Sequence, residues 1–298
     1  DPADDSFVEE SSKKANAIVQ DFFSAEAYRR TEYADLKPKI ITTIAMFYDL
    51  DDPQPFVEDI YDILDDDGIW VLQLSYTPLM LKQLAFDNIC HEHICYYSLS
   101  SMKYLMDRAG FDIVDCQLND VNGGSFRIYL MKKTANKTKF RNQQERDVAN
   151  FRVNSLLEYE KSLKLNDPQT YINFYSEICK LRDDTMSFIK QEKAKGKKIA
   201  GYGASTKGNT LLQWYGLDHN YVDYIAERSE YKYGLKTAGT KIPIIAEADM
   251  RADQPDYLII LPWHFINEFA ERETEYIEKG GKFIVPCPKF LVYPDEGK

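Results

Sequence analysis

The stretch KIAGYGASTKGNTLLQWY, residues 198–215, decides the fold of the C-terminal half of this chain. Its apolar run predicts a strand over Lys198–Gly201, its glycines predict a tight turn, and Thr206–Tyr215 has the pattern of a helix. A strand, a Gly-rich turn and a helix in this order open a parallel α/β unit, in which backbone amides and the helix N-terminus bind phosphate groups. The turn is therefore a candidate nucleotide site.

The turn has two interpretations. Its glycines are similar to the dinucleotide fingerprint, although Thr206 occupies the third glycine position, and Glu227 ends the next predicted strand, where an acid would bind the ribose of a nicotinamide cofactor. In the other interpretation the glycines only allow close packing of the strand against the helix, and the turn binds no ligand. The residues leave both open.

The alternation of apolar and amphipathic runs continues to the end of the chain. It predicts three further strands, at Val222–Ala226, Tyr257–Leu261 and Phe283–Val285, and one helix at Ile266–Glu278. These elements indicate a second, smaller parallel α/β domain of Rossmann-like type.

The N-terminal part shows the same alternation. We expect helices over Ser6–Ala15, Ala25–Arg30, Pro53–Leu64 and Ser100–Arg108, and strands over Ala17–Val19, Lys39–Met46, Ile69–Leu74, Phe111–Leu118 and Ser125–Met131. An Asn-Gly-Gly turn joins the last two strands, which predicts a hairpin at the sheet edge. Asp51 or Asp52 is suited to cap the third helix.

Residues 139–195 are charged, periodic and interrupted once, at Asn166-Asp-Pro168. This pattern predicts two long helices joined by a turn. We therefore expect two domains, residues 1–138 and residues 139–298, the second consisting of the helical linker and the C-terminal α/β unit.

Composition narrows the class of protein. The chain has 298 residues, 44% of them apolar, and a formal net charge of −11, which argues against nucleic acid as a partner. Five cysteines, an odd number, fit free thiols in a reducing cytoplasm better than a disulfide framework. No apolar run approaches the length of a membrane span. We expect a cytoplasmic protein.

Residues Cys90–Leu99, reading CHEHICYYSL, concentrate groups that move protons at neutral pH in a chain with four histidines. His91, Glu92 and His93 suit acid–base catalysis, in which a histidine oriented by a carboxylate takes a proton from carbon or oxygen. A metal site is a second interpretation, because cysteine and histidine bind zinc. In the third, the histidines lie on the surface or in the core and have no chemical role.

Gly123-Gly-Ser-Phe-Arg127 offers a further site. Arg127 can bind an anionic substrate, or the stretch can be a hairpin turn with a solvated arginine.

Three stretches in order now carry a resemblance: FDNICHEHICYYSL at residues 86–99, NGGSFR at 122–127 and GYGASTKGNT at 201–210. Together they resemble the S-adenosylmethionine-dependent C-methyltransferases that act on nucleotide-linked keto-deoxysugars. The resemblance runs from Asp1 to about Tyr293. It implies an incomplete class I methyltransferase sheet, two long helices and a second, smaller Rossmann-like domain.

In that family a zinc-binding module and a first strand with a Gly-rich cofactor turn come before the region matched here. The resemblance therefore implies an N-terminally truncated chain, for which we expect little or no activity by itself. It implies S-adenosylmethionine as cofactor, with Asp1 at the cofactor ribose, Asp21 and Phe22 beside the adenine, and Ala45, Met46 and Phe47 at the methionine end. Considered without the resemblance, Asp1 is an acid in a flexible terminus.

The resemblance implies that His93 is the base that removes the proton beside the sugar ketone, with Glu92 as its neighbouring carboxylate. A family tyrosine falls on Cys90 and a family histidine on Asp49, and Tyr96 or Tyr97 would compensate for them. For substrate binding, the matching motifs and the available charges suggest Tyr97, Asn122, Gly124, Arg127, Gly203, Lys207 and Lys232.

The sequence thus predicts an S-adenosylmethionine-dependent C-methyltransferase for a nucleotide sugar, without a metal in the residues present, as a monomer or homodimer. Two alternatives remain. One is a nicotinamide-dependent oxidoreductase that uses the turn at residues 201–208, and the other is a non-catalytic sugar-nucleotide-binding module.

Overall fold

A computed structural model describes residues 2, 5–139 and 141–294 of the chain. The contacts divide it into two units, the first made of residues 1–77 and 94–163 and the second of residues 78–93 and 164–298. The segment 78–93, which carries His91, Glu92 and His93, therefore groups with the C-terminal residues. Among the described helices, none is both long enough and apolar enough to cross a membrane.

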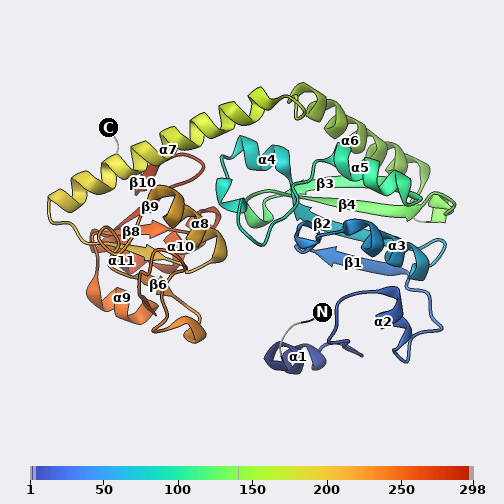
Figure 1. Cartoon of the computed structure of the whole chain (residues 1–298), viewed down its shortest axis with the longest axis horizontal. Helices are drawn as coiled ribbons and strands as arrows, with labels where there is room; N and C mark the ends of the chain where they lie inside the picture. The colour runs from blue at the N-terminus through green and yellow to red at the C-terminus, as the bar shows by residue number, and fades with distance from the viewer. Residues whose placement is uncertain (1, 3–4, 140, 295–298) are drawn as a thin grey trace. The chain divides into compact units, whose positions relative to one another are not determined.

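The first unit is built on a mixed four-stranded sheet of order β1-β2-β4-β3 (Figure 1). Strands β1 (Ile40–Ile44) and β2 (Ile69–Ser75) are parallel. Strands β3 (Phe111–Asn119) and β4 (Ser125–Lys132) form the predicted hairpin, with β3 at the sheet edge. The hairpin prediction is confirmed.

The helices of the first unit are α1 (Asp5–Ser12), α2 (Ala25–Arg29), α3 (Pro53–Ile63), α5 (Leu99–Arg108) and α6 (Gln143–Ser162). Figure 1 shows α5 and α6 beside the β3–β4 hairpin. Asp52 rather than Asp51 caps α3, since its side chain accepts the Gln54 N–H. The predicted strand at Ala17–Val19 is wrong. Those residues pair with no described strand, and so short a run has no stability without a partner.

Aromatic side chains form the centre of the first unit. Trp70, which is completely buried, packs against Phe47, Phe56 and Phe111. Its indole N–H donates to Thr43 Oγ1 at 2.9 Å, so that the one polar atom of this large side chain is satisfied.

The second unit has a six-stranded sheet of order β10-β9-β8-β5-β6-β7. Five strands are parallel: β5 (Ile199–Tyr202), β6 (Ile225–Glu227), β7 (Ile244–Ala246), β8 (Tyr257–Ile260) and β9 (Lys282–Val285). The sixth, β10 (Leu291–Tyr293), is antiparallel to β9 at one edge. The predicted parallel unit is confirmed, whereas β7 and β10 were not predicted, since three-residue strands carry little periodicity.

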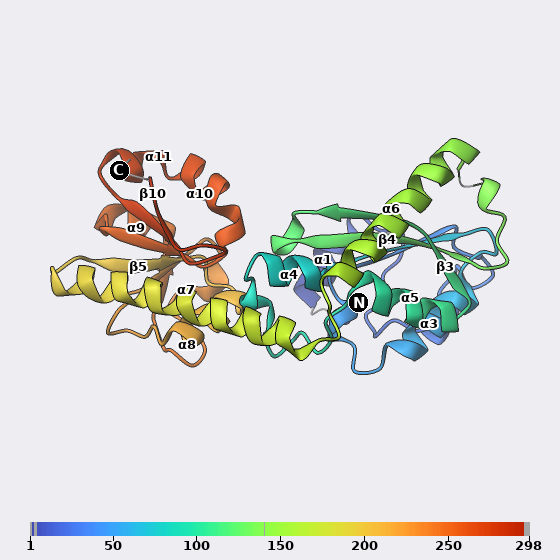
Figure 2. The same ribbon diagram turned by 90° about the horizontal axis from the view of Figure 1, so that it is seen from above.

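Helices cover both faces of this sheet (Figure 2). On one face lie α7 (Pro168–Ala194) and α8 (Thr206–Tyr215), on the other α9 (Glu247–Asp253), α10 (Ile266–Arg272) and α11 (Thr274–Glu278). The expected single helix over Ile266–Glu278 is wrong, because it breaks at Glu273. That buried residue leaves helical geometry and its carboxylate pairs with Arg251.

The chain order changes direction at β5, since β6 lies on one side of it and β8 on the other. In open α/β sheets, ligands bind at the carboxyl ends of the strands at such a switch point. In this unit the segment 78–93 contacts the switch point. The segment contains most of α4 (Thr77–Lys82), followed by the 3-10 turn η2 (Phe86–Asn88). Phe86 packs against Trp214 and Tyr215 of α8, which fixes the segment to the C-terminal sheet.

Candidate active site

The glycines of the 201–208 turn have packing reasons of their own. Gly203 has φ +85°, and a Cβ there would lie 2.6 Å from Pro262 Cγ. A Cβ on Gly201 would overlap Ile225 Cδ1, and one on Gly208 would lie 3.0 Å from Leu261 Cβ. The packing interpretation therefore explains these glycines without a bound phosphate.

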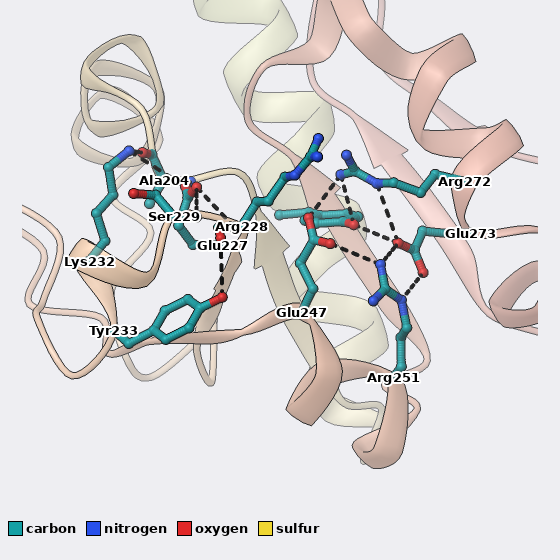
Figure 3. A network of polar contacts seen from close by, with 11 residues as sticks. Ala204, Glu227, Arg228, Ser229, Lys232, Tyr233, Glu247, Arg251, Arg272 and Glu273 are labelled. Atoms are coloured by element: carbon teal, nitrogen blue, oxygen red, sulfur yellow. Dashed lines mark hydrogen bonds and ion pairs between the residues drawn. The ribbon is translucent and has the colours of Figure 1, made fainter. Parts of the chain in front are cut away.

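Glu227, at the end of β6, stabilises the turn itself (Figure 3). Its two carboxylate oxygens accept the backbone N–H groups of Ala204, at 2.7 Å, and of Arg228 and Ser229, both at 2.9 Å. Lys232 donates to the Ala204 carbonyl at 2.7 Å. A carboxylate used in this way is not available for a ribose, which disfavours the nicotinamide interpretation.

Figure 3 shows a second network, on the face of the C-terminal sheet that is covered by α9, α10 and α11. Arg251 and Arg272 bracket the buried Glu273, and both also pair with Glu247. The Tyr202 hydroxyl donates to Glu273 at 2.6 Å. Every charge in this network has a partner, so we assign it to stability.

The switch point carries a different kind of cluster, formed by the segment 78–93 and the ends of β5 and β8. The Trp263 indole N–H donates to Asp87 Oδ2 at 2.9 Å, and Lys207 Nζ donates to Asn88 Oδ1 at 2.7 Å. Asp87 is 1% exposed, and its Oδ1 has no hydrogen-bond partner among the described residues. A buried carboxylate with an unsatisfied oxygen is costly and calls for a functional explanation.

The charges of this cluster act on one another. Burial raises the pKa of Asp87, opposed by the Lys207 ammonium and the Trp263 hydrogen bond. Burial lowers the pKa of Lys207, opposed by the charge of Asp87. Each group thus compensates part of the cost of burying the other.

Two histidines of the second unit are held neutral beside this lysine. Burial lowers the pKa of His93, the Lys207 ammonium lowers it further, and Glu92 opposes the change. Burial and the same ammonium lower the pKa of His264 to about 4, and His264 Nδ1 has no hydrogen-bond partner among the described residues. At neutral pH both imidazoles are therefore mainly in the neutral form, which can accept a proton.

His91 and Glu92 are more exposed than His93. The side chains of His91 and Glu92 are 84% and 53% exposed, and His91 Nε2 lies 3.9 Å from the Glu92 carboxylate. Within the described ranges, no three His, Cys, Asp or Glu residues gather as metal ligands. Of His91, Glu92 and His93, only His93 is half-buried.

Tyr96 and Tyr97 belong to the first unit. Tyr96 is 40% exposed, whereas Tyr97 is 8% exposed and packs against Phe47. Burial raises the pKa of Tyr97. The preceding residues are fixed because Ile94 and Cys95 both donate their N–H groups to the Tyr48 carbonyl.

The residues expected at the cofactor also belong to the first unit. Asp1 lies outside the described residues. Asp21 forms an ion pair with Arg30 at 2.6 Å, Phe22 is 76% exposed, and Ala45, with φ +56°, follows β1. Met46 is half-buried and Phe47 is fully buried in the aromatic core.

Three residues expected at the substrate lie on the hairpin of the first unit. Arg127 Nε donates to Gln73 Oε1 at 2.9 Å, which aligns the guanidinium along the sheet. Gly124, with φ +118°, precedes β4, and the side chain of Asn122 lies outside the described part of the chain. Gly203, Lys207 and Lys232 belong instead to the second unit.

Sequence analysis missed Asp87, Asn88, Trp263 and His264 as site residues. A signal was present, since the first two stand in the FDN start of the 86–99 stretch and the others follow a predicted strand directly. Polar residues just after a parallel strand share the sheet edge at which ligands bind.

The two units, each with a sheet and helices packed on it, define the class as an α/β protein. Residues 3–115 match the family described as methyltransferase domain, and residues 120–288 match the family described as C-methyltransferase C-terminal domain. The chain belongs to this C-methyltransferase family.

A named relative agrees with this assignment. The chain is 31% identical over 240 residues to C-methyltransferase NovU of Streptomyces niveus. The aligned region covers 78% of this chain and 55% of NovU, so the chain spans about half the length of that relative.

Proposed function

We propose that the protein of which this chain is a part transfers a methyl group from S-adenosylmethionine to a carbon of a nucleotide-linked keto-deoxysugar, and that His93 is the base. The observation that carries the proposal is the place of His93 in the segment that contacts the switch point of the C-terminal sheet. The family match and the name of the relative support carbon as the methyl acceptor.

His93 has the properties that this reaction needs. A C–H group beside a ketone loses its proton to a base whose pKa is close to or below neutral, so that the base is free at working pH. Burial and the Lys207 ammonium keep His93 in that form. Glu92, whose charge opposes the shift, stabilises the imidazolium after proton transfer.

The first unit fits a role in cofactor binding. Ala45 and Met46 follow the parallel strand β1, at the edge where class I sheets bind ligands, and the exposed Phe22 ring is suited to stack on a base. S-Adenosylmethionine supplies an electrophilic methyl group on a sulfonium. Asp21, Phe22, Ala45 and Met46 are the described residues that we assign to it, whereas Phe47 supports them from the core.

The proposal is tested by methyl transfer. The whole protein is incubated with thymidine-diphosphate-4-keto-6-deoxyglucose and S-adenosylmethionine carrying a CD₃ group, and the sugar nucleotide is analysed by mass spectrometry. The proposal expects a sugar in which CD₃ replaces a hydrogen on carbon, and loss of this product in His93→Asn. The exposed histidine variant His219→Gln serves as control.

Two outcomes would contradict the proposal. An unmethylated sugar nucleotide in the presence of bound S-adenosylmethionine would favour a binding module. Oxidation or reduction of the sugar with a nicotinamide would favour the oxidoreductase, for which Glu227 would have to leave its three backbone partners.

We further propose a reducing, cytoplasmic setting, since all five cysteines are free thiols.

A further inference from the structure

The Lys207 ammonium lies at the switch point with its charge balanced by a buried acid. Lys207 is in the first turn of α8, donates to Asn88 Oδ1 and interacts electrostatically with Asp87, His93 and His264. All five residues belong to the second unit, so their arrangement does not depend on how the units are placed.

A diphosphate is a poor match for this lysine. Asp87 and Lys207 together have no net charge, whether both are ionised or both are neutral, and both histidines are neutral. A diphosphate carries at least two negative charges and would approach a buried carboxylate, at a cost. A neutral ketone that gains negative charge only during the reaction has no such penalty.

Enolisation needs a donor as well as a base. When a base takes the proton beside a ketone, the C–H electron pair forms a C=C bond and the carbonyl π pair moves onto oxygen. Such an oxyanion is stabilised most by a donor already fixed in a site of low dielectric constant. Lys207 is such a donor: its ammonium donates to the side chain of Asn88 at 2.7 Å, and His93 forms a hydrogen bond with the backbone of the same residue, so donor and base both contact Asn88.

We propose that Lys207 donates to the enolate oxygen while His93 holds the abstracted proton, and that Asp87 is a positioning residue that keeps Lys207 an ammonium. Asp87 itself accepts the Trp263 indole N–H. This inference rests on the proposed function, since it assigns a role within the same reaction.

The test measures proton exchange without any methyl donor. The whole protein is mixed with thymidine-diphosphate-4-keto-6-deoxyglucose in D₂O, and the loss of the proton signal beside the ketone is followed by NMR. Transfer of that proton to His93 and return of a solvent deuteron restores a labelled ketone. Thymidine diphosphate binding is measured in parallel by calorimetry.

We expect Lys207→Met to slow exchange by about 100-fold at saturating substrate, the usual effect of removing one oxyanion donor. The Kd of thymidine diphosphate should change by less than about 3-fold, since this group is not the diphosphate site. Lys207→Gln keeps a neutral N–H donor, so its exchange rate should lie between that of the unaltered protein and that of Lys207→Met. Lys279→Met, a surface variant at the C-cap of α11, is the matched control.

Asp87→Asn tests the positioning role by a pH profile. His93, His264 and Cys90 are the other titratable groups that interact with Lys207, and Cys90 also raises its pKa, but the charge of Asp87 raises it most, against burial. Loss of that charge lowers the pKa of Lys207, so the decline of the exchange rate at alkaline pH should begin at lower pH. A purely structural role would lower the rate equally at every pH.

The outcomes separate the two proposals. Absence of exchange with the unaltered whole protein would sink the proposed function together with this inference. Exchange that persists in both Lys207 variants would sink only the inference. A weaker Kd for thymidine diphosphate with an unchanged rate at saturation would reassign Lys207 to the diphosphate, and an unmoved pH profile in Asp87→Asn would remove Asp87 from the site.

Discussion

The Trp263 indole donates its N–H to the Asp87 carboxylate at 2.9 Å, joining residues 176 positions apart in the chain. The bond connects the segment 78–93 to the residues that follow β8, within the second unit. It is a bond to a buried acid, of the kind worth most in proteins.

Trp263→Phe should therefore destabilise the protein by about 2 kcal/mol more than Trp214→Phe, because it leaves a second Asp87 oxygen without a donor. Trp214 is the matched control, since its Nε1 has no hydrogen-bond partner among the described residues. Urea denaturation followed by circular dichroism measures both free energies of unfolding. Equal losses would show that the hydrogen bond contributes nothing beyond packing.

Below pH 6.5, His264 should reduce the stability of the protein. In the unfolded chain this histidine titrates near 6.5, whereas in the folded chain its pKa is about 4. Between these values the unfolded state binds the extra proton, so the free energy of unfolding falls as the pH drops from 6.5 to 4.

His264→Gln should remove roughly 1–2 kcal/mol of this pH dependence, a range that allows for partial exposure of the ring. Urea midpoints at pH 7.5 and pH 5 measure the effect. His219→Gln, at an exposed position, should keep the dependence of the unaltered chain. If His264→Gln loses as much stability between pH 7.5 and pH 5 as the unaltered chain, His264 is not the source of the pH dependence.

Asp115 in the first unit should stabilise the protein at all but strongly acidic pH. It is completely buried and pairs with Arg152 at 2.8 Å and Arg141 at 2.6 Å. Burial raises the pKa of Asp115, but the hydrogen bonds from both guanidinium groups outweigh it, and the net pKa lies below the usual value.

Because the folded pKa is depressed, the contribution is complete above the unfolded value near 4 and is lost as the pH falls through the folded value. Asp115→Asn should cost about 2–3 kcal/mol at pH 7, and the difference should shrink toward pH 3. Thermal melts at both pH values test this, with Asp107→Asn, a more exposed pair, as control. A cost that does not change with pH would contradict the role of the charge.

Gly203→Ala should act through stability. Its φ of +85° disfavours any side chain, and the new Cβ would lie 2.6 Å from Pro262 Cγ, so we expect a loss of about 2–4 kcal/mol. Gly216→Ala has φ +68° but nothing within 4 Å of the added atom, and should cost only about 1 kcal/mol. If both variants lose the same stability, packing against Pro262 is not the reason for glycine.

Much of the fold could be predicted. The two long helices, the hairpin, α8 and the parallel C-terminal sheet all follow from periodicity and turn residues in the sequence. The errors are short elements, such as the absent strand at Ala17–Val19 and the unpredicted β7, because three residues hold too little pattern. The break at Glu273 depends on a buried ion pair with Arg251, which no local pattern contains.

The site was less predictable. His93 and Lys207 were chosen from motifs, whereas Asp87, Trp263 and His264 became visible only when strand ends were brought together. Glu227 shows the opposite case, since it stands where a ribose-binding acid would stand and is used by three backbone amides instead.

The sequence by itself determined the α/β class, the order of elements and the motifs of the C-methyltransferase family, since these depend on local periodicity and on residue identity. The tertiary structure alone decided that the segment with His93 joins the C-terminal sheet, and that Lys207 and Asp87 balance each other there. The physical reason is that burial and charge–charge interactions depend on distances in space between residues far apart in the chain.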